Sequence, residues 1–318
     1  MKVNLEQKIS TLQGDFTNLS PRIKHLPFDT SVCGERVDVR CSYISFRDGQ
    51  QTFDDFIGTI SELVIPFCIP RNEIKAAQEK LAKGDHVAAG RIFTNLSEKA
   101  RSLFIKAKKG SHRSGEAGEI VLYILTEWLL HAPQIVSKMY LKTNNNMPVH
   151  GTDGIHAKYD NDTKRLYLYW GESKAHVTVE SALSSALDSI KEFITDGHDK
   201  REIEIVSAYS DFNYLDDETK ESFLCYLDPY ADESNDRIVV HSCLLVFEFK
   251  PPDIANLENA ENEFVNLTTE KVEEFIASIG SAIKKKGLAA QRFEFFLMPV
   301  PSVQGFRDKF QEKIGWPK

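Results

Sequence analysis

Residues 151–176 read GTDGIHAKYDNDTKRLYLYWGESKAH, and the predicted arrangement of the sheet follows from this segment. Its two strand-like runs, 151–159 and 165–176, flank the tripeptide Asp160-Asn161-Asp162, which is typical of a hairpin turn. If the runs pair antiparallel around this turn, the numbers of opposed residues sum to about 323 to 325. Asp153 then lies opposite the Gly171–Glu172 position. The sequence therefore predicts a hairpin that places Asp153 beside Glu172.

The elements around this hairpin predict an α/β fold. An apolar helix is expected over 115–131, ended by Pro133, and a short strand around 134–142. A helix over 179–195 and a strand over 202–209 (EIEIVSAY) are expected after the hairpin. The order is α, β, β, β, α, β, which predicts a mixed sheet flanked by helices.

We divide the chain into three regions on this basis. Residues 1–110 form an N-terminal layer, with a strand at 36–47, helices at 72–83 (capped by Asn72) and 86–108, and an ambiguous apolar segment at 52–70. Residues 111–250 form the core and end in an apolar strand at 238–249. Residues 251–318 form a C-terminal α/β extension, with a helix at 269–286, a strand at 292–300 and a helix at 302–314.

Composition excludes several classes of protein. With 42% hydrophobic and 27% charged residues, the chain is too apolar for a disordered protein, and no apolar run approaches the roughly 18 to 20 residues of a membrane span. The N-terminus shows no secretion signal, so we expect a cytoplasmic protein without membrane contact. Five cysteines without a C-x-x-C pair argue against a disulfide framework and a structural zinc site. No G-x-x-x-x-G-K-[ST] motif occurs, so we expect no nucleotide bound by this chain.

Charge is unevenly distributed around a net value of −8. Residues 99–113 contain six basic residues and no acid, whereas residues 211–236 contain nine acids and one base. The basic run is a candidate for contact with a nucleic-acid backbone, and solvated surface is the alternative. Its candidate DNA-binding residues are Lys106, Lys108, Lys109, His112 and Arg113.

The hairpin also carries a chemical constellation. Side chains alternate along a strand, so Glu172 and Lys174 point to the same face, beside Asp153. Mg²⁺ prefers oxygen ligands, commonly one or two carboxylates together with phosphate and water, and Mn²⁺ is expected to substitute for it. A bound divalent ion makes water a nucleophile near neutral pH, and Lys174 could orient that water. Asp153 and Glu172 are therefore the expected metal ligands.

Three further residues are candidates beside this constellation. Glu119 on the apolar helix would reach the metal through a bound water, and Glu116, three residues earlier on the same helix face, is the alternative. His176 shares a strand face with Lys174 and could contact a phosphate, although surface imidazole is the simpler interpretation. His156 points to the strand face opposite Asp153, which predicts a structural role.

Three motifs resemble the PD-(D/E)xK nuclease superfamily: GEAGEIVLYIL (115–125), GTDGIH (151–156) and WGESKAH (170–176). The resemblance covers about 115–209. More narrowly, RSGEAGE (113–119) together with GTDGIH and GESK is similar to the HamA family, the nuclease subunits of Hachiman anti-phage defence systems. The resemblance implies a restriction-endonuclease-like αβββαβ core and a metal-dependent endonuclease that cuts DNA. It also implies Glu119, Asp153, Glu172 and Lys174 as catalytic residues, and a separately encoded helicase as partner.

Two alternatives and one further expectation accompany this interpretation. The chain could be a nuclease-like subunit that binds DNA or a partner without catalysis, or a nuclease directed at RNA. The acidic segment 211–236, with interleaved aromatic residues, is expected to dock the partner, either alone or together with the C-terminal extension, and a solvated acidic loop is the alternative. These aromatic residues are Phe212, Tyr214, Phe223, Tyr226 and Tyr230.

Overall fold

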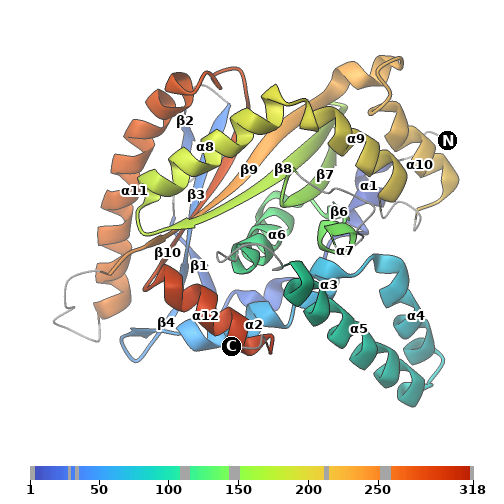
Figure 1. Cartoon of the computed structure of the whole chain (residues 1–318), viewed down its shortest axis with the longest axis horizontal. Helices are drawn as coiled ribbons and strands as arrows, with labels where there is room; N and C mark the ends of the chain where they lie inside the picture. Colours follow the sequence, from blue (N-terminus) through green and yellow to red (C-terminus); the bar gives the residue numbers. More distant parts are fainter. Residues whose placement is uncertain are drawn as a thin grey trace.

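The computed structural model describes residues 4–27, 30–32, 36–107, 115–142, 151–210, 215–250 and 259–315. Within these ranges, eight strands form one twisted sheet (Figure 1). Seven of them follow one another across the sheet in the order β1 (Ile23–His25), β3 (Val37–Ile44), β10 (Phe293–Val300), β9 (Arg237–Glu248), β8 (Arg165–His176), β7 (Gly154–Asp160) and β6 (Gln134–Val136). The short β2 (Thr30–Val32) pairs with β3, and β4 (Phe46–Arg47) and β5 (Gln50–Gln51) form a separate small hairpin.

The sheet is mixed, as predicted. Four strands in the middle of the sheet run parallel to one another: β3, β10, β9 and β8. The outer pairs β7–β8, β6–β7, β1–β3 and β2–β3 are antiparallel. All three of the predicted sequence regions contribute strands to it, because β3 and β10 lie beside the strands of 134–248. The mixed sheet with helices on both faces confirms the α/β, restriction-endonuclease-like fold class.

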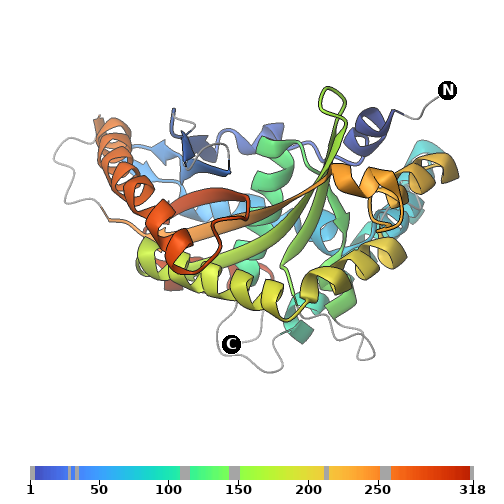
Figure 2. The same cartoon turned by 90° about the horizontal axis from the view of Figure 1, so that it is seen from above.

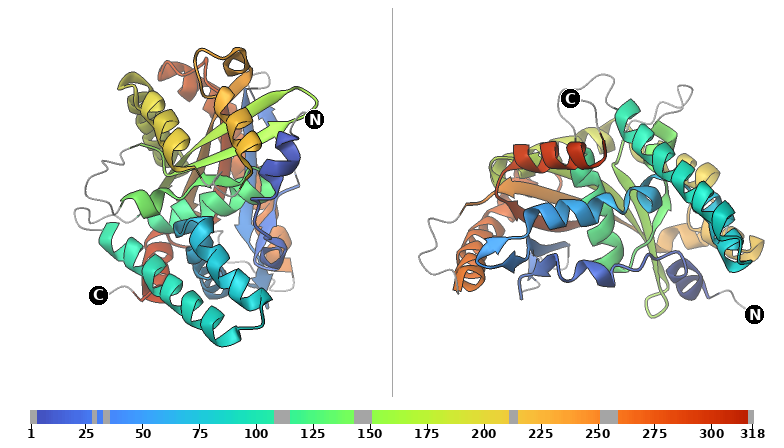
Figure 3. Two further views of the ribbon diagram at one scale, coloured as in Figure 1. Left: turned by 90° about the vertical axis from the view of Figure 1, so that its right-hand side faces the viewer. Right: turned by 90° about the horizontal axis from the view of Figure 1, so that it is seen from below.

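Helices cover both faces of the sheet (Figures 1 and 2). One face carries α1 (Leu5–Ser10), α8 (Val179–Thr195), α9 (His198–Tyr209), α10 (Asp217–Cys225) and α11 (Ala260–Lys285). The other carries α2 (Phe53–Ser61), α3 (Val64–Cys68), α6 (Glu116–Leu130) and α12 (Val303–Lys313). The antiparallel pair α4 (Arg71–Ala82) and α5 (His86–Ala107) extends to one side (Figure 3). The short α7 (Lys138–Lys142) and two 3₁₀ turns, Thr17–Leu19 and Asp232–Asp236, complete the described elements. None of the described helices combines the length and apolarity that a membrane crossing requires.

Strand β8 changes character along its length, and this change positions the site. Its first half is apolar on both faces, because Tyr169 packs toward α6 while Leu168 and Trp170 pack toward α8 and α9. Beyond Gly171 its side chains are half-buried and include Glu172 and Lys174. The β7–β8 ladder ends at the Gly154–Gly171 pair, so this second half of β8 pairs with β9. A polar strand edge therefore begins where the hairpin ladder ends.

The hairpin register agrees with the prediction. Opposed residues run from Asp160–Arg165 to Gly154–Gly171, so their numbers sum to 325. One residue before the ladder, the backbone N–H of Asp153 donates to the carbonyl oxygen of Gly171 at 2.7 Å. Asp153 and Glu172 consequently occupy neighbouring positions on adjacent strands.

One predicted strand was wrong, and another was shorter than predicted. Residues 202–209 belong to helix α9, not to a strand. Their alternating Glu and Ile suggested a period of two, but Glu202, Ile205 and Val206 are buried with the spacing of a helix face. The last strand of the αβββαβ order is therefore β9. The strand expected around 134–142 ends at Val136, and α7 follows it.

The remaining predicted elements are confirmed within a few residues, with three refinements. The ambiguous segment 52–70 forms α2 and α3. Pro70, not Asn72, occupies the N-cap of α4, where its fixed φ suits the helix start. Helix α11 begins at Ala260, well before the expected residue 269.

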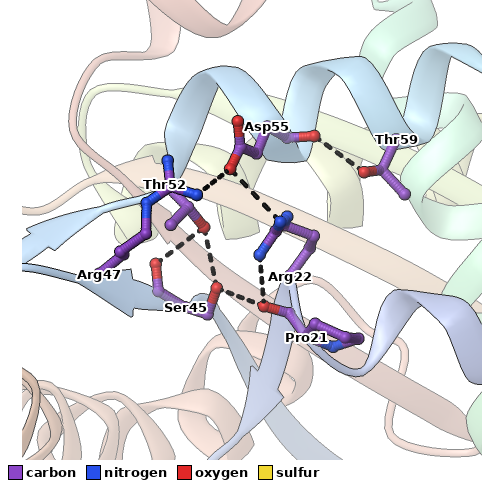
Figure 4. A network of polar contacts seen from close by, with 7 residues as sticks. All are labelled: Pro21, Arg22, Ser45, Arg47, Thr52, Asp55 and Thr59. Atoms are coloured by element: carbon purple, nitrogen blue, oxygen red, sulfur yellow. Dashed lines mark hydrogen bonds and ion pairs between the residues drawn. The ribbon is translucent and has the colours of Figure 1, made fainter.

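Two polar networks hold the N-terminal region: the first lies within it, and the second joins it to α6 and β6. In the first, the Ser45 hydroxyl contacts the Pro21 carbonyl at 2.7 Å and the Thr52 hydroxyl at 2.8 Å (Figure 4). The Asp55 carboxylate, in the first turn of α2, pairs with Arg47 at 2.9 Å and with Arg22 at 3.4 Å. The start of α2 is thereby fixed against β1 and β3.

The second network is buried beneath α6. The fully buried Glu127 carboxylate accepts hydrogen bonds from the backbone N–H groups of Gln134 (2.7 Å) and Gly14 (2.9 Å). Arg71 lies 3.4 Å from this carboxylate and also donates to the carbonyl oxygen of Leu12 at 2.7 Å. Four distant segments meet at this one ion pair.

Candidate active site

A pocket of about 270 Å³ lies on the α8 face of the sheet, where the β7–β8 ladder ends. Asp153, Glu172 and Lys174 all line it, so the structure brings these three predicted residues together. The sheet side is completed by Gly151, Thr152, Trp170, Gly171 and His241, and the helix side by Ser189, Ile190, Glu192, Phe193 and His198. The pocket is therefore bounded by the sheet below and by α8 and the start of α9 above.

Glu172 and Lys174 form the central contact of the pocket. The Lys174 Nζ lies 2.6 Å from Glu172 Oε1, and the side chains are 25% and 12% exposed respectively. Both point toward α8, because alternate residues of β8 share a face. The Ser189 hydroxyl of α8 also hydrogen-bonds to Glu172. The glutamate is thus oriented by a cation and a hydroxyl.

Asp153 is fixed by β8 from the other side. Its Oδ2 accepts a hydrogen bond from the backbone N–H of Ser173 at 2.9 Å, in addition to the backbone bond to Gly171. Both bonds anchor Asp153 to the strand that carries Glu172. The two carboxylates therefore share one small pocket, and each has a defined orientation.

The electrostatics of the pair follow from this proximity. Burial raises the pKa of Glu172 to about 7, and the neighbouring Asp153 carboxylate acts in the same direction, while Lys174 opposes both. For Lys174, burial by itself lowers the pKa, but the Glu172 carboxylate outweighs it and leaves the pKa raised. The site thus holds a glutamate that titrates near neutral pH beside a permanent ammonium.

This donor set fits a divalent cation with oxygen ligands. Two carboxylates that repel one another gain from a shared cation, and Mg²⁺ commonly takes one or two protein carboxylates with water and phosphate as the remaining ligands. Within the described part of the chain, no three His, Cys, Asp or Glu side chains are grouped closely enough to form a complete metal cage. Asp153 and Glu172 would therefore supply part of a coordination shell, with solvent and substrate supplying the rest.

Glu119 and Glu116 lie elsewhere. Both belong to the first turn of α6, which packs on the opposite face of the sheet, and neither lines the pocket. The helix approaches β8 closely, since a Cβ at Gly118 would collide with the Ser173 hydroxyl between Glu172 and Lys174. The role of Glu119 in holding a metal-bound water stays a prediction, as does the choice between it and Glu116.

The two histidines of the hairpin differ. His156 is buried and its Nδ1 contacts the carbonyl oxygen of Ala132 at 2.9 Å, in agreement with the structural role predicted for it. His176 is half-buried and lines a second pocket of about 490 Å³, which also contains Lys174 and Arg307. Lys174 therefore borders both pockets, whereas His176 borders the second.

The predicted DNA-binding run is described only at its start. Lys99 Nζ pairs with Glu73 at 2.6 Å and contacts the Tyr140 hydroxyl at 3.3 Å, so this lysine is engaged within the fold. The side chain of Lys106 and the residues Lys108, Lys109, His112 and Arg113 lie outside the described residues. Their contact with DNA stays a prediction.

The acidic segment contains fewer surface aromatics than its sequence suggested. Phe223 and Tyr226 are buried against β7 and β8, whereas Tyr230 is 95% exposed. Phe212 and Tyr214 lie outside the described residues. Asp216 caps α10 through the backbone N–H of Thr219 at 2.8 Å and pairs with Lys8 at 2.7 Å, which holds the pKa of Asp216 well below its usual range.

Sequence reasoning missed the helix wall of the pocket. Ser189, Glu192 and His198 lie on α8 and α9, and His241 lies within the apolar run of β9. The Nε2 of His241 and the Nε1 of Trp170 are buried and make no hydrogen bond within the described residues. A histidine inside an otherwise apolar strand was the one local signal, and nothing in the sequence placed it opposite Trp170 at the edge of this pocket.

Comparison with known proteins identifies the family. The family model HamA matches residues 21–314, which is nearly the whole chain. A search of curated proteins found no match. The matched region contains every strand of the sheet and the pocket with Asp153, Glu172 and Lys174. The chain therefore belongs to the HamA family and is a Hachiman-type defence protein.

Proposed function

We propose that this chain is a metal-dependent endonuclease that hydrolyses DNA phosphodiester bonds. The observation that carries the proposal is the pocket in which Asp153, Glu172 and the Glu172–Lys174 ion pair meet at the end of the hairpin ladder. Membership of the HamA family and the resemblance to PD-(D/E)xK nucleases support the same activity.

Asp153 and Glu172 would hold the divalent ion. When bound, this ion would act as a Lewis acid that polarises a phosphate oxygen and would lower the pKa of a bound water. The chain's own residues do the rest. Asp153, fixed by the Ser173 and Gly171 backbone, and Glu172, fixed by Lys174 and Ser189, present oxygen atoms in one place. Lys174 presents an ammonium that can orient the attacking water and balance charge on the phosphate oxygens. The oxygen of water bonds to phosphorus and gives one proton to solvent, one bridging P–O bond breaks, and the departing oxygen takes up a proton from solvent, so that a phosphate monoester and an alcohol are formed.

We further propose that a separately encoded helicase controls the nuclease, as the family resemblance implies. An unrestrained nuclease would damage its host. Expression of the chain without its partner should therefore be toxic while Glu172 and Lys174 are intact. Toxicity that persists in the Glu172→Gln and Lys174→Met variants would point to another cause.

Cleavage of matched DNA and RNA by the purified protein, alone and with its partner, tests the activity. We expect cutting of DNA in Mg²⁺ or Mn²⁺, none in EDTA, and a loss of at least about a hundredfold in Asp153→Asn, Glu172→Gln and Lys174→Met. Glu204→Gln, an exposed acid on α9, is the matched control and should cut normally. Preferential cutting of RNA would favour the RNA-directed alternative. Inactivity of the complete complex would favour a subunit without catalysis.

A further inference from the structure

A buried ion pair lies directly behind the pocket. The Lys138 Nζ of α7 is 2.6 Å from Glu202 Oε1 of α9, and both side chains are only 1% exposed. The second carboxylate oxygen of Glu202 is buried and makes no hydrogen bond within the described residues. Burying two charges is costly, and a half-satisfied carboxylate recovers little of that cost. Stability alone therefore gives a poor reason for this pair.

The pair closes on the chain segment that leads to Asp153. Lys138 Nζ contacts the Thr152 hydroxyl at 3.2 Å, and Thr152 is itself buried. A Cβ at Gly151 would collide with Glu202 Oε1 and would lie 3.5 Å from Lys138 Nζ. Gly151 also has a φ of 140°, a conformation that other residues rarely adopt. The backbone of Gly151 and the hydroxyl of Thr152 therefore lie against the ion pair.

The contact with Lys138 and Glu202 holds residues 151 and 152, which lie beyond the β7–β8 ladder. The β7–β8 ladder ends at Gly154, and Asp153 retains its backbone hydrogen bond to Gly171 and its side-chain bond from Ser173. Residues 151 and 152 lie beyond this ladder, at the end of a strand where fraying is expected. Asp153 is thus held by β8 on one side and by Lys138 and Glu202, through Gly151 and Thr152, on the other.

We infer that Lys138 and Glu202 are positioning residues, which fix Gly151 and Thr152 so that the Asp153 carboxylate stays opposite Glu172. The inference deepens the proposed function, since it concerns the proposed metal ligand Asp153. Lys138 and Glu202 do not line the pocket and would not touch the metal or the substrate. Residues that orient metal ligands typically change metal affinity about 10- to 100-fold when they are removed.

The decisive variant replaces both charges together. Lys138→Met with Glu202→Leu keeps approximate volume and removes both charges of the pair, so the double variant should fold, whereas Lys138→Met alone leaves the buried Glu202 carboxylate without this cation. Lys138→Glu with Glu202→Lys reverses the pair and serves as the rescue variant. Glu204→Gln, exposed on the same helix, is the matched control.

Two measurements are made on each folded variant. In EDTA, amide hydrogen exchange should show a loss of protection in a peptide that spans 151–155 in the double variant, with protection of 166–170 unchanged. In a Mn²⁺ titration, the double variant should bind at least about tenfold more weakly than the wild type, and the reversed pair should regain part of the affinity. A high concentration of Mn²⁺ should restore most of the cleavage rate of the double variant.

The outcomes separate the inference from the proposed function. Unchanged exchange at 151–155 in the double variant would overturn the positioning role, whether or not the chain binds metal. Reduced protection with wild-type Mn²⁺ affinity would also overturn it, provided that Asp153→Asn weakens binding. If Asp153→Asn binds Mn²⁺ as tightly as the wild type does, the proposed metal site is wrong. The exchange data alone then decide whether Lys138 and Glu202 hold residues 151 and 152 in place.

Discussion

Lys174 Nζ and Glu172 Oε1 lie 2.6 Å apart on one face of β8, and Asp153 faces the same pocket from the end of β7. Strand β8 therefore carries both Glu172 and, two residues later, the lysine that pairs with it. Burial and the Asp153 carboxylate raise the pKa of Glu172 to about 7 even though Lys174 lies beside it. A cation bound in the pocket would favour the ionised form of Glu172.

Neutralising Glu172 should stabilise the metal-free chain at alkaline pH. The pKa of Glu172 rises from an ordinary 4.5 to about 7 on folding, so the stability associated with its protonated form is present below about pH 4.5 and is lost as the pH rises to 7. Glu172→Gln escapes this loss and should be more stable than the wild type by about 2 to 3 kcal/mol at pH 8, and equally stable near pH 4.5. Chemical denaturation in EDTA at both pH values measures this difference. A variant that is less stable than the wild type at pH 8 would show Glu172 to be structural.

Metal binding should release a proton in a pH-dependent way. A carboxylate must be deprotonated to act as a ligand, so below pH 7 the cation competes with the proton on Glu172. Apparent affinity should fall by up to about tenfold per pH unit below 7 and level off above it. Calorimetry in buffers of different ionisation enthalpy should find close to one proton released at pH 6 and almost none at pH 8. An equal release at both values would contradict the assignment.

Breaking the Arg71–Glu127 pair should destabilise the fold without touching the pocket. Arg71→Met leaves the fully buried Glu127 carboxylate without its cation, which should cost about 3 kcal/mol. Arg91→Met, at an exposed position on α5, is the matched control and should be nearly neutral. Unfolding midpoints in EDTA check both variants. A neutral Arg71→Met would mean that the backbone N–H groups of Gly14 and Gln134 hold Glu127 alone.

The basic run should contribute to DNA affinity through charge. Replacing Lys106, Lys108 and Lys109 with Gln should weaken binding to every DNA sequence alike and lower the salt slope of log K by about one for each phosphate that the variant no longer neutralises. A variant with Lys80, Lys83 and Arg91 replaced on the exposed faces of α4 and α5 controls for net charge. If both variants change the slope equally, the run acts only through overall charge.

Partner docking on the acidic segment should depend on its exposed acids. Asp216 is unsuitable for charge reversal because it caps α10 and pairs with Lys8, so the clean variant reverses Asp217, Glu218 and Glu221. If this surface docks a helicase, co-purification with the partner should become weaker and lose its salt dependence. Reversal of the exposed Glu62, Glu79 and Glu98 in the N-terminal region is the control. A complex that survives the α10 reversal unchanged would place the partner's binding surface elsewhere.

The residues that the hairpin contributes to the pocket could be predicted from the sequence, because the turn and the alternation of side chains along a strand are local features. The Asp160–Asp162 turn set the hairpin register, and the register set Asp153 beside Glu172. At 202–209, the alternation of Glu and Ile fitted a strand as well as a helix. The segment forms helix α9, which buries Glu202, Ile205 and Val206 against the rest of the fold. The helix wall of the pocket depends on how α8 crosses the sheet, which no local pattern specifies. Lys138 and Glu202 are 64 residues apart and would ordinarily be assigned to the surface.

The most direct test of the metal site is anomalous diffraction from crystals soaked in Mn²⁺. We expect one strong peak within coordination distance, about 2.0 to 2.4 Å, of both the Asp153 and Glu172 carboxylates, and no peak there in Asp153→Asn or Glu172→Gln crystals. A wild-type crystal with Mn²⁺ bound only at other positions, or a peak that persists unchanged in both variants, would contradict it.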